Sequence, residues 1–172
     1  MIVNPTNPEI VFVAAAGPLW GAGGDRGLFR TIDGGRTWKN VKSIDTHTGF
    51  TDVIFDPSNH NVIYAASFQR ERRPYSYVGG GPGSGLWKSI DGGDSWTKLT
   101  EGLPKDDVGR IGLDVSRSSP NVVYATIETK VTGTGASTGN TEGSVYRSDD
   151  YGASWQQMGT GFSYPWSMGQ IP

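Results

Sequence analysis

One octet of residues occurs three times in this 172-residue chain, and it constrains the fold more than any other feature. The copies begin at Thr31, Ser89 and Ser148, at intervals of 58 and 59 residues. All three follow the pattern [S/T]-x-D-x-G-x-[S/T]-W. A fixed period indicates a repeat architecture in which each period is one supersecondary unit.

A second motif keeps the same period. Turn-forming segments rich in Pro, Asn and Ser lie at residues 4–8, 56–60 and 116–120. Each segment leads into a short, continuous apolar run, and these runs span residues 10–15, 62–66 and 122–126. Runs of this length with β-branched residues, bounded by turn signals, predict strands buried on both faces.

Each period therefore predicts four strands. In the middle copy we expect them at residues 51–55, 62–66, 85–89 and 96–99. No segment shows a 3.6-residue apolar period long enough for a helix. The predicted fold class is all-β: a β-propeller fragment of about three four-stranded antiparallel blades, joined by octet hairpins.

The aligned periods divide the chain. We expect blade 1, with a truncated first strand, at residues 1–45, blade 2 at 46–103, blade 3 at 104–161 and the start of a truncated fourth blade at 162–172. Propellers close with roughly four to eight blades, so missing blades of a parent chain are expected partners. Exposed edges and apolar faces predict self-association of the isolated chain.

Composition excludes several classes of function. The 26 glycines and six tryptophans fit tight turns between strands, because disordered chains are poor in aromatic residues. With 15 basic and 17 acidic residues, no nucleic-acid partner is expected. The chain has no Cys, which excludes disulfides, thiolate nucleophiles and zinc–thiolate sites. No apolar run is long enough for membrane insertion.

The octet has the chemistry of a structural turn. Its Ser or Thr hydroxyl and its Asp carboxylate accept hydrogen bonds from nearby backbone N–H groups, and its Trp packs against the sheet. We therefore assign a structural role to Thr31, Asp33, Gly35, Trp38, Ser89, Asp91, Gly93, Trp96, Ser148, Asp150, Gly152 and Trp155. The alternating oxygen ligands and the closing Glu of a calcium loop are missing, so no metal and no cofactor are expected.

The long loops and linkers are expected at the end of the blades opposite the octets, where binding residues concentrate. Aromatic planes beside guanidinium groups suit the stacking and hydrogen bonding of a glycan or peptide ligand. The ligand-binding candidates are Trp20, Arg26, Arg70, Arg72, Arg73, Tyr75, Tyr77 and Trp166. Two alternatives remain open: the arginines pair with Glu71 in a solvated loop, and Trp20 anchors loop packing.

Hydrolysis of a glycoside requires two carboxylates roughly 5–9.5 Å apart. The candidates for a catalytic role are Asp25, Glu71, Asp107 and Glu128, with Asp45 and Asp106 also at the loop end. Their spacing in the sequence selects no pair. This favours a binding chain over an enzyme.

The octets resemble the Asp-box, or bacterial neuraminidase repeat, of sialidase-like, xyloglucanase-like and sortilin-type propellers. Residues 17–21, 79–85 and 121–128 resemble bacterial proteins labelled glycosyl hydrolase or sortilin-like. The resemblance implies the glycan- or peptide-binding portion of a sortilin-like propeller from a larger secreted protein, extracellular or periplasmic. The alternative that it implies is the truncated catalytic domain of a xyloglucanase-like glycoside hydrolase. A sialidase is disfavoured because the arginines cluster within one loop.

Overall fold

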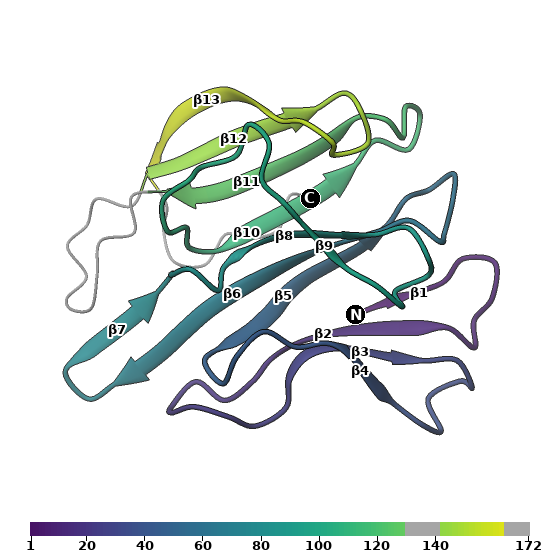
Figure 1. Cartoon of the computed structure of the whole chain (residues 1–172), viewed down its shortest axis with the longest axis horizontal. Coiled ribbons are helices and arrows are strands. Elements are labelled where there is room, and N and C mark those ends of the chain that lie inside the picture. The colour runs from purple at the N-terminus through teal and green to yellow at the C-terminus, as the bar shows by residue number, and fades with distance from the viewer. Residues whose placement is uncertain (130–141, 164–172) are drawn as a thin grey trace.

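The computed structural model describes residues 1–129 and 142–163, which form three antiparallel sheets (Figure 1). The first sheet contains β1 (Ile2–Val3), β2 (Val11–Ala16), β3 (Arg26–Thr31) and β4 (Lys39–Lys42). The second contains β5 (Thr48–Phe55), β6 (Ile63–Arg73), β7 (Ser76–Gly79), β8 (Gly85–Ser89) and β9 (Thr97–Leu99). The third contains β10 (Ile111–Val115), β11 (Val123–Thr129), β12 (Glu142–Ser148) and β13 (Gln156–Ser163).

The predicted all-β fold is confirmed. Apart from β7, which pairs with β6 alone, the strands follow one another across each sheet in chain order, and every pair is antiparallel. The apolar runs form the second strand of each sheet, where they have neighbours on both sides. The described residues contain no helix, and so none that could cross a membrane.

One element was not expected. Residues 67–84 lie between the strands expected at 62–66 and 85–89, but β6 continues to Arg73 and pairs with β7 in a hairpin. Arg70 pairs with Gly79 and Arg73 with Ser76, leaving Pro74 and Tyr75 in the turn. The sequence did not predict this part of the strand, because strands are predicted from an alternation of apolar and polar residues. A hairpin that extends beyond the sheet does not need an apolar face, and its residues are mostly charged or polar.

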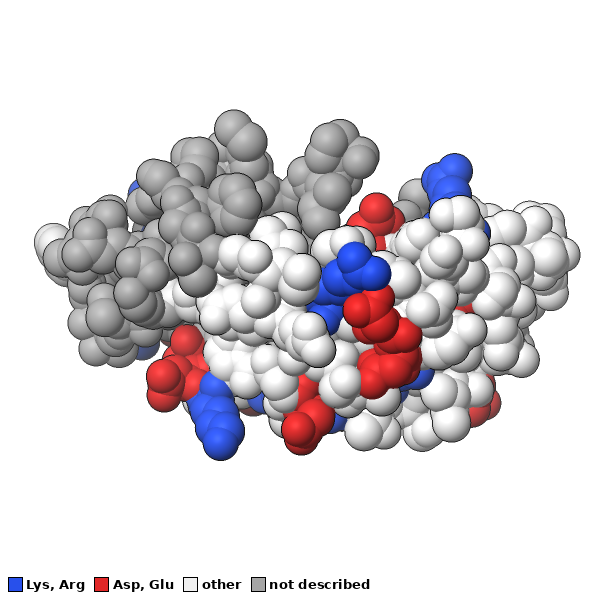
Figure 2. All heavy atoms as spheres, turned by 90° about the horizontal axis from the view of Figure 1, so that it is seen from above, with Lys and Arg blue, Asp and Glu red and all other residues white. Residues whose placement is uncertain are grey.

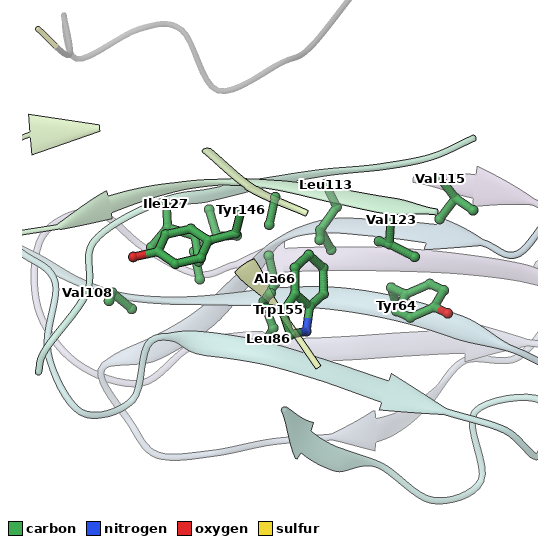
Figure 3. Close-up of a cluster of buried hydrophobic side chains, with 12 residues drawn as sticks. Tyr64, Ala66, Leu86, Val108, Leu113, Val115, Val123, Ile127, Tyr146 and Trp155 are labelled. Atoms are coloured by element: carbon green, nitrogen blue, oxygen red, sulfur yellow. The ribbon is translucent and has the colours of Figure 1, made fainter. Parts of the chain in front are cut away.

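The core lies between the sheets, in two clusters. The cluster between the first and second sheets contains Phe12, Leu28, Phe50, Val53, Phe55, Ile63 and Ala65. The cluster between the second and third sheets includes Tyr64, Leu86, Ile111, Leu113, Val123, Ile127, Tyr146 and Trp155 (Figure 3). Neighbouring β6 residues thus face opposite sheets, as the two-residue period of a strand requires. The three sheets stack face to face as successive blades.

The surface carries charges of both signs. In the view of Figure 2, acidic and basic side chains lie next to each other over the described part of the face. Ion pairs within the described residues include Arg30 with Asp94, Arg73 with Glu71 and Arg147 with Asp149.

Candidate functional site

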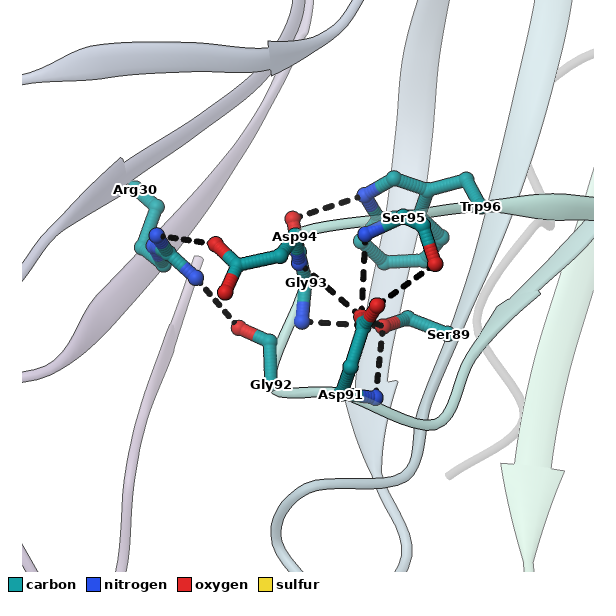
Figure 4. A network of polar contacts seen from close by, with 8 residues as sticks. All are labelled: Arg30, Ser89, Asp91, Gly92, Gly93, Asp94, Ser95 and Trp96. Carbon is teal, nitrogen blue, oxygen red and sulfur yellow. Dashed lines mark hydrogen bonds and ion pairs between the residues drawn. The ribbon is translucent and has the colours of Figure 1, made fainter.

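The middle octet is a closed network of hydrogen bonds (Figure 4). The Ser89 hydroxyl accepts from the Gly93 N–H at 2.8 Å and donates to the Asp91 carboxylate at 2.8 Å. That carboxylate also accepts from the Ser95 N–H at 2.9 Å and from the Ser95 hydroxyl at 2.5 Å. The Trp96 indole N–H donates to the Gly93 carbonyl at 3.1 Å. The turn thereby satisfies its own polar groups.

The other two octets repeat these bonds. In each, the hydroxyl at the seventh position donates to the Asp and holds its pKa down, well below the usual range for Asp33 and Asp91 and to about 2 for Asp150. These carboxylates are therefore occupied by the turn. The described residues include no group of three or more His, Asp or Glu that could hold a metal ion.

Arg26 organises the loop between β2 and β3. Its buried guanidinium donates to the carbonyls of Ala16 and Pro18, both at 2.7 Å, and of Gly21 and Gly23, both at 3.0 Å. Four backbone carbonyls thus surround one cation. Contact between Arg26 and a ligand remains a prediction.

A polar cluster joins residues 43–47, which link β4 to β5, to the hairpin of β6 and β7. Glu71 on β6 accepts from Arg73 Nε at 2.7 Å and lies 3.0 Å from His47 Nδ1. The bond from Arg73 is the main reason why the pKa of Glu71 is lowered. Asp45 accepts from the His47 N–H at 2.7 Å and from the Thr48 hydroxyl at 2.9 Å. Glu71 is therefore held as an anion.

The loop of the first sheet packs against this hairpin. The Arg72 N–H donates to the Leu19 carbonyl at 2.9 Å, and the Arg72 guanidinium lies 5.9 Å from the centre of the Trp20 ring. Trp20 is 63% exposed. Tyr75 is exposed at the hairpin tip. We call Trp20, Arg72 and Tyr75, with the ion pair Glu71–Arg73, the loop-end rim.

Arg70 on β6 contacts the loop between β2 and β3. It donates to the Gly17 carbonyl at 3.2 Å, while its buried Nε has no hydrogen-bond partner. Tyr77 and Glu128 lie where the second sheet meets the third. The Glu128 carboxylate accepts from the Arg110 N–H at 3.0 Å. Burial raises the pKa of Tyr77, and the negative charge of Glu128 adds to this effect.

A pocket of about 370 Å³ lies between β8, β9 and residues 100–108. Its floor is apolar, with Leu86, Leu99, Leu103, Val108, Ile111 and Ile127. Its charged lining residues are Lys98, Lys105, Asp106 and Asp107. The structure thus brings Asp107 together with two lysines, whereas Asp25 is exposed beside β3 in the first sheet. Trp166 lies outside the described residues.

Asp52 on β5 was missed by sequence reasoning. Its carboxylate accepts from the Leu113 N–H of the third sheet at 3.0 Å and from the Val53 N–H at 2.9 Å. Burial raises the pKa of Asp52 even though these hydrogen bonds oppose the shift. The sequence feature that could have indicated it is a single acidic residue within an otherwise largely apolar strand. Its hydrogen bond to Leu113 links β5 to β10, the first strands of the second and third sheets.

Two curated relatives align with this chain. A probable oligoxyloglucan-reducing end-specific xyloglucanase of Neosartorya fischeri is 26% identical over 119 residues, which cover 66% of this chain and 13% of that protein. A xyloglucanase of a Paenibacillus species is 25% identical over 177 residues, covering 90% of this chain and 15% of that protein. The chain thus spans less than a sixth of either relative. No family model matches it.

Two solved structures show the same fold. An ancestral GH74 enzyme aligns with a TM-score of 0.61 at 22% identity, covering 91% of this chain and 18% of that one. A Niastella koreensis GH74 enzyme aligns with a TM-score of 0.61 at 17% identity, covering 90% and 20%. The predicted β-propeller fold is thereby confirmed. The relatives favour the xyloglucanase-like side of the resemblance over the sortilin-like side.

Proposed function

We propose that this chain forms a polysaccharide-binding part of a glycoside hydrolase propeller of the xyloglucanase type. Both curated relatives are xyloglucanases, and one of them aligns with 90% of the chain. An extracellular or periplasmic location is part of this proposal, because a polysaccharide of that kind lies outside the cytoplasm. The substrate class is a glucan backbone with sugar side chains.

The exposed Trp20 ring is the observation that carries the proposal. Its flat apolar face is available at the loop end, and the Arg72 guanidinium lies 5.9 Å from the ring centre. An aromatic plane offers a large contact area for the apolar face of a sugar ring, while a guanidinium donates to hydroxyl groups. Arg26 and Arg70 bind loop carbonyls behind this surface and hold it in shape.

The proposed role is binding rather than hydrolysis by this chain alone. A general acid must keep its proton near the working pH, so its pKa has to be raised. Glu71 has the opposite shift, because Arg73 and His47 stabilise its anion. Asp52 has a raised pKa but accepts hydrogen bonds from two backbone N–H groups between the sheets.

Calorimetric titration with xyloglucan oligosaccharides tests the proposal. We expect the unmodified chain to bind, and Trp20→Ala to lose at least tenfold in affinity, the effect of removing about 1.4 kcal/mol. The matched control is Tyr151→Ala, which removes an exposed aromatic ring at the octet end. No binding by the unmodified chain, or equal affinity of the Trp20→Ala chain, contradicts the proposal. Binding of peptides instead would favour the sortilin-like alternative.

A further inference from the structure

Both junctions between sheets use the same polar contact. At the first junction, Arg30 on β3 donates to the Gly92 carbonyl at 2.7 Å and pairs with Asp94 at 2.7 Å (Figure 4). At the second, Lys88 on β8 donates to the Tyr151 carbonyl at 2.6 Å. In each case a cation on the third strand reaches the fourth residue of the next octet. We call this contact the inter-blade clasp.

An aromatic ring on the second strand completes each inter-blade clasp. A Cβ atom added to Gly93 would lie 2.7 Å from the Phe12 ring, and one added to Gly152 would lie 3.1 Å from the Tyr64 ring. The Tyr64 hydroxyl also donates to the Tyr151 carbonyl at 2.8 Å. The octet glycine therefore packs directly on the ring, too close for a Cβ atom at Gly93 and with only a tight fit for one at Gly152.

The receiving half of the inter-blade clasp occurs a third time, on the third sheet. Tyr124 and Arg147 occupy the positions of Tyr64 and Lys88 in the repeat. The Arg147 guanidinium lies 5.7 Å from the Tyr124 ring centre and donates to its hydroxyl at 3.2 Å. Arg147 also pairs with the exposed Asp149 at 2.6 Å. The cation and the ring thus lie as close together as at the second junction, where Lys88 Nζ is 5.5 Å from the centre of the Tyr64 ring.

The inserting half is present at the opposite end of the described stack. In the first octet Gly34 and Gly35 are both exposed, whereas Gly93 and Gly152 are buried. Trp38 of this octet is 44% exposed. The chain therefore presents the two complementary halves of the inter-blade clasp on its two outer sheets.

We propose that a second copy of this chain docks its first octet on the third sheet, with the Gly34 carbonyl accepting from Arg147 and Gly35 seated on the Tyr124 ring. The contact continues the interface that the chain already makes twice internally. It joins different surfaces of the two copies, so it builds rings or open chains. At the sixth octet position Arg36 stands where the middle octet has Asp94, so a cation rather than a carboxylate faces Arg147.

Analytical ultracentrifugation over a concentration series tests the proposal on the full 172-residue chain. We expect reversible self-association that Arg147→Ala weakens by about tenfold, because a hydrogen bond from a charged donor is lost. Arg36→Asp recreates the Arg30–Asp94 pair across the contact and should tighten association about tenfold. The middle octet carries Asp at this position, so the turn accepts it.

The double variant and a control decide the outcome. Adding Arg147→Ala to Arg36→Asp should abolish the gain, because the new carboxylate loses its cation. Arg117→Asp makes the same change of charge on an exposed turn of the third sheet and should leave association unchanged. Circular dichroism checks that each variant folds. A monomer at every concentration, or association that Arg147→Ala leaves unaltered, overturns the proposal.

Discussion

The first and third octets have the same turn but different surroundings. The hydroxyls of Thr31 and Ser148 accept glycine N–H groups at 2.9 and 2.8 Å, and both Trp indoles donate to a carbonyl at 3.1 Å. Yet Trp38 is 44% exposed and Trp155 only 4%. The turn conformation is therefore a local property of eight residues, while burial is supplied by the preceding sheet.

Trp155 shows what the preceding sheet adds. It lies in the cluster with Tyr64 and Leu86 of the second sheet, which Figure 3 shows around it. Trp96 in the middle octet is partly buried and packs against the cluster between the first and second sheets. Burial of each octet thus depends on the neighbouring sheet, and the following variants separate this contribution from the local hydrogen bonds.

Trp155→Ala should give the largest difference between the octets. We expect it to lower the free energy of unfolding by about 3–5 kcal/mol, because it leaves a cavity between two sheets. Trp38→Ala removes the same local hydrogen bond from an exposed site and should cost about 1 kcal/mol or less. Urea denaturation of both variants measures the difference. Equal losses would show that packing against the neighbouring sheet adds nothing to the stabilisation by the octet Trp.

Removal of the octet hydroxyl should have the same effect in both places. Thr31→Val and Ser148→Ala each leave a glycine N–H without its partner and remove one of the donors to the octet Asp, at a cost of about 1–2 kcal/mol. The two losses should agree within about 0.5 kcal/mol, because the bonds do not involve the neighbouring sheet. A clearly larger loss for Ser148→Ala would mean that the turn conformation depends on packing against the neighbouring sheet.

Lys88→Met tests the polar part of the second junction. The methionine keeps most of the side-chain volume but cannot donate to the Tyr151 carbonyl. Since the Tyr64 hydroxyl still donates to that carbonyl, we expect a loss of only about 1 kcal/mol. Tyr64→Phe combined with Lys88→Met should cost more than the sum of the single variants. Additive losses in urea denaturation would show that the two donors act independently.

The pH dependence should be the smallest effect, because the octet carboxylates are exposed and screened by solvent. Asp150 has a pKa lowered to about 2, below the ordinary value of an unfolded chain, so its contribution is full above about pH 4. That contribution is lost as the pH falls through about 2. Asp150→Asn should lower stability at pH 7 and flatten the acid limb of a denaturation profile. An unchanged acid limb would contradict the assigned hydrogen bonds.

The sequence predicted the features that depend on local chemistry. The octets at 31, 89 and 148 place three hairpins, and the apolar runs place the second strand of each sheet. The hairpin of β6 and β7 was not predicted, because its polar residues lack an apolar period. The difference in burial between Trp38 and Trp155 could not be predicted either, because octets of the same pattern carry no information about what packs on them.

The candidate site was predictable only in its residue types. The sequence predicted arginines and aromatic residues at the loop end. It did not predict which of them support the loop and which remain exposed. Arg26 binds four backbone carbonyls, whereas Trp20 remains exposed. This division follows from loop geometry, which side-chain chemistry alone does not specify.

Amide hydrogen exchange at the octet glycines tests most directly whether packing against the neighbouring sheet stabilises these turns. Gly35, Gly93 and Gly152 donate to their octet hydroxyls at 2.8–2.9 Å, so local bonding alone gives all three similar protection. In dilute protein we expect Gly93 and Gly152 to exchange with the global unfolding of the chain, and Gly35 to exchange at least tenfold faster by local opening. Equal protection of all three amides would contradict the account.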